Sequence, residues 1–406
     1  MRALMVGNMY PPHHFGGYEQ VWQSAVAHLR GTGARMRVLA VDFRLPGVPD
    51  GDQPEVHREL HWYWRNHDFP VLGLHRRLAI ERHNQQLLAH HLDDMRPDVV
   101  GFWSMGGMSH SLLESVRRRG VPAVAFVHDE WLDYGRHTDG WLKLFYGRKG
   151  VLAPAVERMT GLPTRVTYAG AARYVFVSEF VRQRALALPL GLTDTGVAHS
   201  GINESFLQAR ERPPWRWKLL YVGRLHPDKG IADAVAALAQ LPAEASLTFV
   251  GSWDEREAVR LQADVRRLGL EERVQMLGQR PRAALRDLYA DADALLFPVR
   301  WEEPWGLVPL EAMGSGCPVV ATGRGGSGEY LRDGDNCLLF PAGDAGALAA
   351  ALRRLANSPE LRERLRAGGL ATAPRYTEAI FNAAVETELR ARCAARQPVT
   401  TSAAGA

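Results

Sequence analysis

The sequence predicts an α/β protein made of two doubly wound domains, each built on a parallel sheet. Three observations predict this class: short apolar runs recur along the chain, helix-like amphipathic segments separate them, and the recurrence is interrupted once near the middle. Continuous apolar runs of this length are typical of strands buried on both faces, and their alternation with helices indicates parallel sheets with right-handed crossovers. A chain of 406 residues also suits two domains better than one.

The apolar runs form two series of expected strands. In the first half they are ALMVG, RVLAVD, DVVGFW, AVAFVHD and YVFVS, at residues 3–7, 37–42, 98–103, 123–129 and 174–178. In the second half they are LLYVG, LTFVG, VQML, ALLFP and PVVAT, at residues 219–223, 247–251, 274–277, 294–298 and 318–322. Between strands of the second series, the amphipathic pattern predicts helices that include residues 231–241, 254–268 and 345–355.

The interruption between the two series lies at residues 199–218, where Pro213 and Pro214 stand in a segment of mixed charge without periodicity, as in a linker. We therefore expect one domain at 1–200 and a second at 201–376. A C-terminal helix is expected at 377–396, crossing back to the first domain, and a disordered tail at 397–406. Residues 131–167 are irregular and are expected to form a helical insertion.

Composition excludes several functional classes. The 49 basic residues face 45 acidic ones, so the formal charge is only +4, which lacks the concentrated basic stripe of a nucleic-acid-binding protein. This mild excess suits an anionic small ligand or an anionic membrane surface. Three scattered cysteines show no disulfide or metal-ligand spacing, and no run is long enough for a signal peptide or a membrane span. We expect a cytoplasmic protein without a metal, with peripheral contact to the inner membrane surface as an open alternative.

The stretch WEEPWGLVPLEA, at residues 301–312, places carboxylates in an otherwise apolar segment. An unpaired buried carboxylate is costly, so Glu303 and Glu311 each require a partner if they face inward. Glu311 is expected on the inward face of a helix, and Glu303 in the loop before it. The alternative is equally compatible with the pattern: Glu303 stabilises the helix N-terminus and Glu311 points to solvent.

The same stretch predicts an anion site where its helix begins. Pro304 disfavours helical backbone at the preceding residue, so the helix is expected to start near Gly306. The first amides, near Leu307 and Val308, then lack intrahelical partners and can bind an anion.

The turn GRLHPDKG, at residues 223–230, places two cations at the carboxyl end of an expected strand. Arg224 and Lys229 together suit a diphosphate. An ordinary exposed turn with solvated charges is the alternative.

Two further loops follow expected strands in the first half. The loop GNMYPPHHFGGYEQ, at residues 7–20, contains Gly16 and Gly17 before a helix that starts near Tyr18, and these glycines allow a ligand to approach the backbone closely. It is not GxGxxG, so a dinucleotide fingerprint is absent. His128 ends another apolar run and is expected at the rim of a ligand site, although a hydrogen-bonded structural histidine is the more common case.

The second half of the chain resembles the nucleotide-sugar domain of family-4 retaining glycosyltransferases, which have the two-domain GT-B fold. The likeness rests on GRLHPDKG (223–230), EPWGLVPLEAMGSGCPVVAT (303–322), GGSGE (325–329) and the Glu-x7-Glu pair Glu303/Glu311, and it extends from about residue 219 to residue 341. It implies a Rossmann-like acceptor-binding domain followed by a Rossmann-like nucleotide-sugar domain. It also implies transfer of a hexosyl group, with retention, from a nucleotide sugar to a hydroxyl acceptor, with UDP the favoured base and no metal or other cofactor.

The resemblance implies a role for each motif residue. Glu303 matches the residue that contacts the donor sugar, Glu311 the one that holds the ribose hydroxyls, and His128 a histidine near the reacting sugar carbon. Arg224 and Lys229 match the basic pair that neutralises the donor diphosphate. The other donor-binding positions that it implies are Gly16, Gly17, Gly251, Gln279, Arg280, Trp305, Gly306, Leu307 and Val308. Trp305 stands where the family more often has Phe.

Alternatives of other classes remain open at this stage. A GT-B epimerase or hydrolase, or a non-catalytic GT-B scaffold, would share the fold, whereas an NAD-dependent oxidoreductase would need the missing GxGxxG. The acceptor is either a soluble small molecule or glycan, or a lipid-linked molecule on an anionic membrane. Residues 117–119 and 141–149 are the candidate basic and aromatic membrane contacts.

Overall fold

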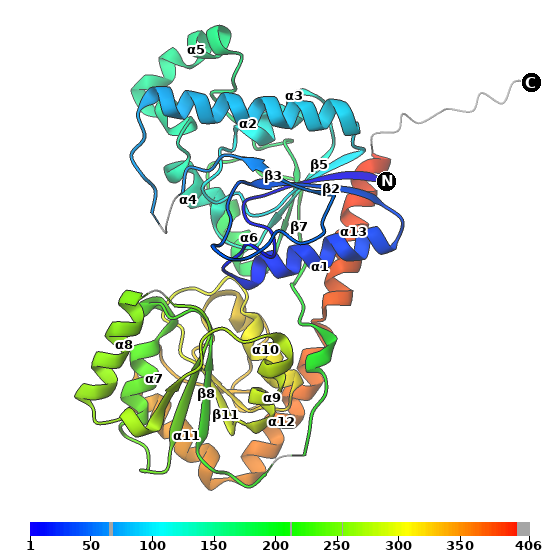
Figure 1. The fold of residues 1–406 in the computed structure, drawn as a ribbon. Helices are drawn as coiled ribbons and strands as arrows, with labels where there is room; N and C mark the ends of the chain where they lie inside the picture. The colour runs from blue at the N-terminus through cyan, green and yellow to red at the C-terminus, as the bar shows by residue number, and fades with distance from the viewer. Residues whose placement is uncertain (65–67, 212, 254, 396–406) are drawn as a thin grey trace, which may run out of the picture. The chain divides into compact units, whose positions relative to one another are not determined.

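The computed structural model describes residues 1–64, 68–211, 213–253 and 255–395, which form two compact units (Figure 1). The first unit contains Met1–Ala198 and the C-terminal segment from Asn382 onward, and the second contains His199–Phe381. Each is built on one parallel sheet with helices on both faces, which confirms the predicted fold class. The expected tail at 397–406 and residue 254, the expected start of one helix, lie outside the described residues.

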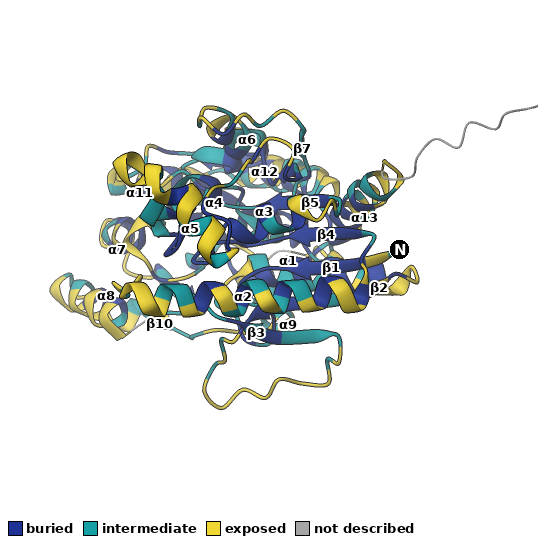
Figure 2. Ribbon diagram, turned by 90° about the horizontal axis from the view of Figure 1, so that it is seen from above, coloured by how far each residue is buried: buried dark blue, intermediate teal, exposed yellow. Residues whose placement is uncertain are grey.

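The first unit has a seven-stranded sheet of order β3-β2-β1-β4-β5-β6-β7, in which all neighbouring strands are parallel. Its strands are β1 (Arg2–Val6), β2 (Arg35–Val41), β3 (Val56–Leu60), β4 (Val99–Phe102), β5 (Ala123–Val127), β6 (Arg173–Phe176) and β7 (Thr195–Val197). The central strands β4 and β5 are buried along their whole length, as their continuous apolar sequences require (Figure 2).

Helices cover both faces of this first sheet. They are α1 (Gly17–Gly31), α2 (Leu74–Met95), α3 (Ser111–Arg118), α4 (Trp131–Thr138), α5 (Ala153–Thr160), α6 (Glu179–Leu186) and α13 (Glu378–Ala394). Of α13, the part that begins at Asn382 belongs to this unit. In Figure 1, α2 and α3 lie on one side of the sheet and α1 on the other. The segment expected to be a helical insertion contains α4, two 3₁₀ turns and α5.

Ion pairs and hydrogen bonds attach the last helix, α13, to the first unit. Glu386 lies 2.8 Å from the Nε2 atom of His28 on α1, and Glu388 accepts two hydrogen bonds from the guanidinium of Arg173 on β6. The C-terminal segment is therefore part of the packing of the N-terminal sheet.

The second unit has a six-stranded parallel sheet of order β10-β9-β8-β11-β12-β13. Its strands are β8 (Lys218–Val222), β9 (Ser246–Val250), β10 (Val274–Met276), β11 (Ala294–Phe297), β12 (Val319–Ala321) and β13 (Leu338–Leu339). Its helices are α7 (Ile231–Leu238), α8 (Glu255–Arg267), α9 (Arg282–Asp291), α10 (Leu307–Gly314), α11 (Ala345–Asn357) and α12 (Pro359–Thr372). In Figure 1, α7, α8 and α11 lie on one side of the strands, and α9, α10 and α12 on the other.

Strand order reverses once in each sheet, between β1 and β4 in the first unit and between β8 and β11 in the second. At such a reversal the loops that follow the two strands diverge to opposite faces, and open α/β sheets place their ligands beside the carboxyl ends of those strands. The loops after β1 and β8 contain the predicted glycine pair and the predicted basic pair. The loop after β11 contains the first carboxylate of the Glu-x7-Glu pair.

Within the described residues, no helix has both the length and the apolar character needed to cross a bilayer. All three cysteines are free thiols.

Candidate active site

The loops after β8 and β11 lie against each other in the second unit. The backbone N–H of Arg300 donates to the carbonyl oxygen of Asp228 at 2.7 Å. Gly230 makes this approach possible, because its φ is +72° and a Cβ at this position would lie 1.8 Å from the carbonyl oxygen of Pro298. Lys229, the residue before this glycine, is thereby held against the β11 loop.

Lys229 and Glu303 form an ion pair with 2.6 Å between Nζ and Oε2. Trp301 completes the group, because its indole N–H donates to the same carboxylate oxygen at 2.8 Å and its ring lies 4.5 Å from the ammonium nitrogen. The pair is largely shielded, with the Lys229 side chain 19% and the Glu303 side chain 11% exposed. The partner required by the inward carboxylate is therefore a cation from the other loop, and two of the predicted catalytic residues contact each other.

Arg224, in the loop after β8, is exposed to solvent. Its charge and that of Glu303 both act on the same residue, Tyr221. The buried Tyr221, at the end of β8, donates its hydroxyl to the carbonyl oxygen of Arg224 at 3.3 Å. Burial and the negative charge of Glu303 raise the pKa of Tyr221, whereas the positive charge of Arg224 lowers it. Arg224 is thus an exposed cation near the shielded Lys229–Glu303 pair, at the reversal of the strand order.

The glycine-rich loop at 325–329 fixes the backbone around Glu303. The N–H of Gly326 donates to the carbonyl oxygen of Glu303 at 2.7 Å. Gly325 has a φ of +64°, and a Cβ at this position would lie 2.4 Å from the same oxygen. Gly325 is therefore required so that the chain of this loop can pass close to Glu303.

Helix α10 begins at Leu307, as predicted, after Gly306 at its N-cap with a φ of +86°. No side chain caps this end, so the first amides, including those of Leu307 and Val308, face no capping group. The hydroxyl of Tyr330 donates to the carbonyl oxygen of Gly306 and holds the cap in place. The uncapped helix start is therefore present where the sequence places it, and anion binding there stays a prediction.

Glu311 lies on α10 and accepts a hydrogen bond from the hydroxyl of Tyr289, on α9, at 2.8 Å. Burial raises the pKa of Glu311, and burial together with the Glu311 charge raises the pKa of Tyr289. The alternative in which Glu311 points freely to solvent is wrong. Its carboxylate oxygens can accept further hydrogen bonds beside the one from Tyr289.

Three other predicted donor-binding residues lie along the same edge of the second sheet. Gly251, at the end of β9, has a φ of +146°, and a Cβ at this position would lie 2.0 Å from the carbonyl oxygen of Gly223 at the end of β8. Gln279 and Arg280 follow β10, the strand beyond β9, and both are exposed. Gln279 and Arg280 therefore lie at the same edge of the sheet, two strands away from β8, whose following loop contains Lys229.

Trp305 does not line an open surface of the second unit. It is only 3% exposed, its indole N–H donates to the carbonyl oxygen of Ser200 at 2.8 Å, and its ring stacks on His199 with 4.3 Å between centroids. It also packs edge-on against Tyr330 and Tyr376. This burial argues against direct contact of its side chain with a donor and assigns the side chain to packing.

In the first unit, the glycine pair follows β1 and begins α1. Gly16 is the N-cap; its N–H donates to the carboxylate of Glu19 at 3.2 Å, and the ring N–H of His14 donates to its carbonyl oxygen at 2.9 Å. Gly16 and Gly17 are both exposed. Their backbone is accessible to a ligand, as the sequence predicts for this loop.

His128 follows β5 and is part of an aromatic stack. Its ring lies parallel to that of Tyr18, with 4.4 Å between centroids, and 5.8 Å from that of Trp103, which follows β4. Burial lowers the pKa of His128 to about 3, so the imidazole is neutral at physiological pH. Sequence reasoning missed Tyr18 and Trp103, although both follow the strands at the reversal of the first sheet.

Asp129, beside His128, was not predicted as a site residue. Burial raises its pKa to about 6, and it accepts hydrogen bonds from the hydroxyl of Tyr134 at 2.9 Å and from the backbone N–H of Trp131 at 3.0 Å. A carboxyl group with a raised pKa at the carboxyl end of a central strand is typical of functional sites.

The basic run at 117–119 is paired with carboxylates. Arg117 and Arg118 both bind Glu114, at 2.6 and 2.8 Å, and Arg118 also binds Glu157 at 2.7 Å. Arg119 binds Asp93 at 2.6 Å. These pairs argue against a free cationic patch for a membrane at this run. Trp141, from the second candidate segment, is buried.

Two family models match consecutive parts of the chain. Residues 203–371 match the family model of glycosyl transferases group 1, and residues 15–206 match that of glycosyltransferase family 4. The glycogen synthase of Mycobacterium tuberculosis is 28% identical over 388 residues, covering 90% of this chain and 88% of that protein. A phosphatidyl-myo-inositol mannosyltransferase of Mycobacterium leprae is 33% identical over 56% of this chain and 58% of its own length.

Solved structures share the fold at lower sequence identity. Sucrose-phosphate synthase from Thermosynechococcus elongatus superposes with a TM-score of 0.74 at 19% identity, covering 97% of this chain and 99% of that chain. Anabaena Alr3699/HepE, solved in complex with UDP and glucose, superposes with a TM-score of 0.67 at 19% identity, covering 96% of this chain and all of that one (100%).

Proposed function

This chain belongs to the family-4 glycosyltransferases of the GT-B fold, and on that premise we propose that it transfers a hexosyl group from a nucleotide sugar to an acceptor hydroxyl. The proposal includes retention at the anomeric carbon, a UDP-sugar as donor, and a role in the synthesis of a glycan, a glycolipid or a natural-product glycoside. Relatives named as a glycogen synthase and a mannosyltransferase support hexosyl transfer, and a structural relative in complex with UDP and glucose supports the base.

One observation carries the proposal: the shielded Lys229–Glu303 pair lies at the strand-order reversal of the second sheet, beside the exposed Arg224. A donor diphosphate offers Lys229 a second anionic partner. When the ammonium binds the phosphate, the Glu303 carboxylate can accept hydrogen bonds from sugar hydroxyls. The pair is thus arranged so that one ligand with a diphosphate and a sugar engages both of its members.

The remaining residues of the second unit complete the proposed donor site. Arg224 and the uncapped start of α10, at Leu307 and Val308, stabilise the negative charge that develops on the departing diphosphate. Glu311 accepts hydrogen bonds from the ribose hydroxyls, with Tyr289 holding its carboxylate in place.

Retention is proposed to follow a front-face route. The departing diphosphate oxygen takes the proton of the acceptor hydroxyl on the face where the new bond to the anomeric carbon forms. His128 is proposed to lie near that carbon, and its lowered pKa means that it acts as a neutral hydrogen-bonding group rather than as a cation. The acceptor is proposed to bind to the first unit, near the glycine pair Gly16 and Gly17.

The test is turnover with defined donors. The purified full chain is incubated without metal with the glucose conjugates of UDP, GDP, ADP and dTDP and a panel of hydroxyl acceptors, and nucleotide release is measured. The proposal predicts release with one nucleotide, preferentially UDP, and a product with the donor's anomeric configuration by NMR. Inversion would contradict the mechanism. Tight nucleotide-sugar binding without turnover across acceptors would favour a scaffold.

The proposed location is the cytoplasm, and the three free thiols support this. Peripheral membrane contact stays a prediction; if it occurs, it requires a surface other than the paired arginines at 117–119.

A further inference from the structure

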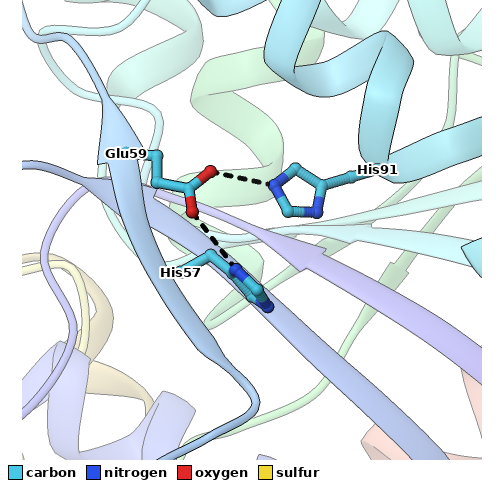
Figure 3. Close-up of side chains that lie close together, drawn as sticks. All are labelled: His57, Glu59 and His91. Carbon is cyan, nitrogen blue, oxygen red and sulfur yellow. Dashed lines mark hydrogen bonds and ion pairs between the residues drawn. The ribbon is translucent and has the colours of Figure 1, made fainter. Parts of the chain in front are cut away.

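The edge strand β3 and helix α2 bring two histidines and a glutamate together away from the proposed donor site (Figure 3). One Glu59 carboxylate oxygen lies 3.3 Å from Nδ1 of His57, and the other lies 3.2 Å from Nε2 of His91. The candidate ligand atoms of all three residues lie within 4.8 Å of one another. Figure 3 shows the carboxylate between the two imidazole rings.

The local structure explains why the three side chains converge. His57 and Glu59 are two residues apart on β3, so they project from the same side of the strand. His91 lies on α2, which packs on β3, and its side chain is only 3% exposed. The His57 and Glu59 side chains are 31% and 42% exposed, so solvent reaches the group from one side.

We propose that His57, Glu59 and His91 bind a zinc ion, with water from the solvent side as the fourth ligand. Two imidazoles and one carboxylate are a donor set that zinc uses in proteins, at ligand distances of about 2.0–2.2 Å. A tetrahedral ion with such bonds has ligand atoms about 3.3 Å apart. The two measured carboxylate–imidazole distances, 3.3 and 3.2 Å, run to different oxygens of Glu59 and are close to that spacing. All candidate ligand atoms lie within 4.8 Å of one another, so a rotation of the side chains can bring them around one ion.

Arg37 must move away from His91 before zinc can bind there. Its guanidinium, which can only donate, lies 3.2 Å from Nδ1 of His91 and also binds Asp94 at 2.8 Å. Without metal, Nδ1 of His91 therefore accepts, and Nε2 carries the proton that faces Glu59. Zinc at Nε2 displaces that proton to Nδ1, so Arg37 must leave His91. Removing the Arg37 donor is thus expected to tighten zinc binding.

No spacing in the sequence indicates this group, because a strand supplies two residues and a helix supplies the third 32 positions after Glu59. The site lies on the edge strand, beyond β2 and β1 from the reversal of the sheet. The ion is therefore inferred to tie β3 to α2 and to leave the proposed transfer reaction free of metal.

The test is calorimetric titration of zinc chloride into the tag-free full chain after treatment with a chelator. The proposal predicts one ion per chain and loss of at least about tenfold in affinity in Glu59→Gln and His57→Gln. Glu59→Gln is the sharpest variant, because it removes the negative charge and one acceptor oxygen while nearly keeping the size of the side chain. His90→Gln is the matched control, since His90 is the exposed neighbour of His91 on α2; its affinity should not change.

Thermal unfolding and Arg37→Met provide independent readouts. Zinc should raise the Tm of the wild type and of His90→Gln but not that of Glu59→Gln, and Arg37→Met should bind zinc more tightly than the wild type. Absence of zinc binding, equal affinity in Glu59→Gln and the wild type, or equal loss in His90→Gln would overturn the site. The group would then be a hydrogen-bonded clamp between strand and helix.

Discussion

The two units reverse their strand order in the same way, but the side chains at the two reversals differ in kind. At the second reversal, Lys229 and Glu303 form a shielded ion pair beside the exposed Arg224. At the first, Tyr18 and His128 stack as neutral rings. Charge suits an anionic ligand, and flat neutral rings suit an uncharged one. The same fold thus presents different side chains at its two reversals, and the difference lies in the segments that follow the strands rather than in the sheets.

The largest expected effect follows from removing the cation of the shielded pair. Lys229→Met leaves the Glu303 carboxylate without its ion-pair partner and removes a charge proposed to bind the diphosphate, so kcat/KM should fall about 10²–10³-fold. The matched control is Lys218→Met, because Lys218 pairs with Asp291 at an exposed position on the same unit. The two variants are compared by donor turnover and by circular dichroism. Equal loss of activity in the two variants, or loss of activity that parallels loss of folded protein, would contradict this. The Lys229–Glu303 pair would then matter no more than an exposed surface pair.

Gly230 tests whether the close approach of the β8 and β11 loops builds the charged reversal. Gly230→Ala forces a Cβ against the carbonyl oxygen of Pro298 at a φ of +72°, so the free energy of unfolding should fall by about 3 kcal/mol. Gly269→Ala is the matched control: its φ is +64° but no atom lies within 4 Å of the added Cβ, so the loss should be about 1 kcal/mol. Both values come from urea unfolding, and similar losses would mean that the approach of the loops contributes little.

The aromatic reversal is tested through its neutral histidine. Because burial lowers the pKa of His128 to about 3, the unfolded chain binds the proton more strongly, and this histidine contributes stability above pH 6.5 that is lost as the pH falls toward 3. The wild type should lose about 1.6 kcal/mol of unfolding free energy between pH 6.5 and pH 5 through this histidine, and His128→Gln should lack that loss. Urea unfolding at several pH values measures this, and an unchanged acid dependence would contradict the buried neutral state.

Activity of the same variant gives a second readout. Donor turnover by His128→Gln should fall about 10-fold or more if the imidazole lies near the reacting carbon, and the wild type should show no acid limb near pH 6.5 from this group. If turnover by the wild type falls as the pH drops through 6.5 and turnover by the variant does not, the imidazole is protonated in the working enzyme.

The smallest effect is expected where an ion pair is exposed. Arg119 and Asp93 have side chains 39% and 70% exposed, so solvent screens their attraction. Arg119→Gln should change the unfolding free energy by less than about 1 kcal/mol and leave co-sedimentation with anionic vesicles unchanged. Loss of vesicle binding in this variant would restore the basic run as a membrane contact.

The sequence predicts most strands but misses those with little apolar signal. All ten apolar runs contain strands, and burial on both faces explains the continuous pattern of most of them; β10 is a partly exposed edge strand. The missed strands are β3, β7 and β13. β3 reads VHREL and pairs on one side only, and β13 has two residues, so neither carries a pattern that periodicity can detect.

The sequence likewise predicts some features of the candidate site and misses others. Position after a strand and the glycosyltransferase resemblance both indicate Lys229 and Glu303, but not that they bind each other across 74 positions. The partner of Glu311, the stack on His128 and the burial of Trp305 also depend on contacts between distant segments. Such contacts follow from the packing of the elements, which local sequence does not record.

The central claim is that the charged reversal of the second sheet binds the nucleotide diphosphate. The most direct measurement is calorimetric titration of UDP, GDP, ADP and dTDP, without metal, into the wild type, Lys229→Met and Lys218→Met. The account predicts selective binding of one nucleotide, weakened about tenfold or more in Lys229→Met and unchanged in Lys218→Met. No nucleotide binding by the wild type, or equal affinity in all three proteins, would contradict it.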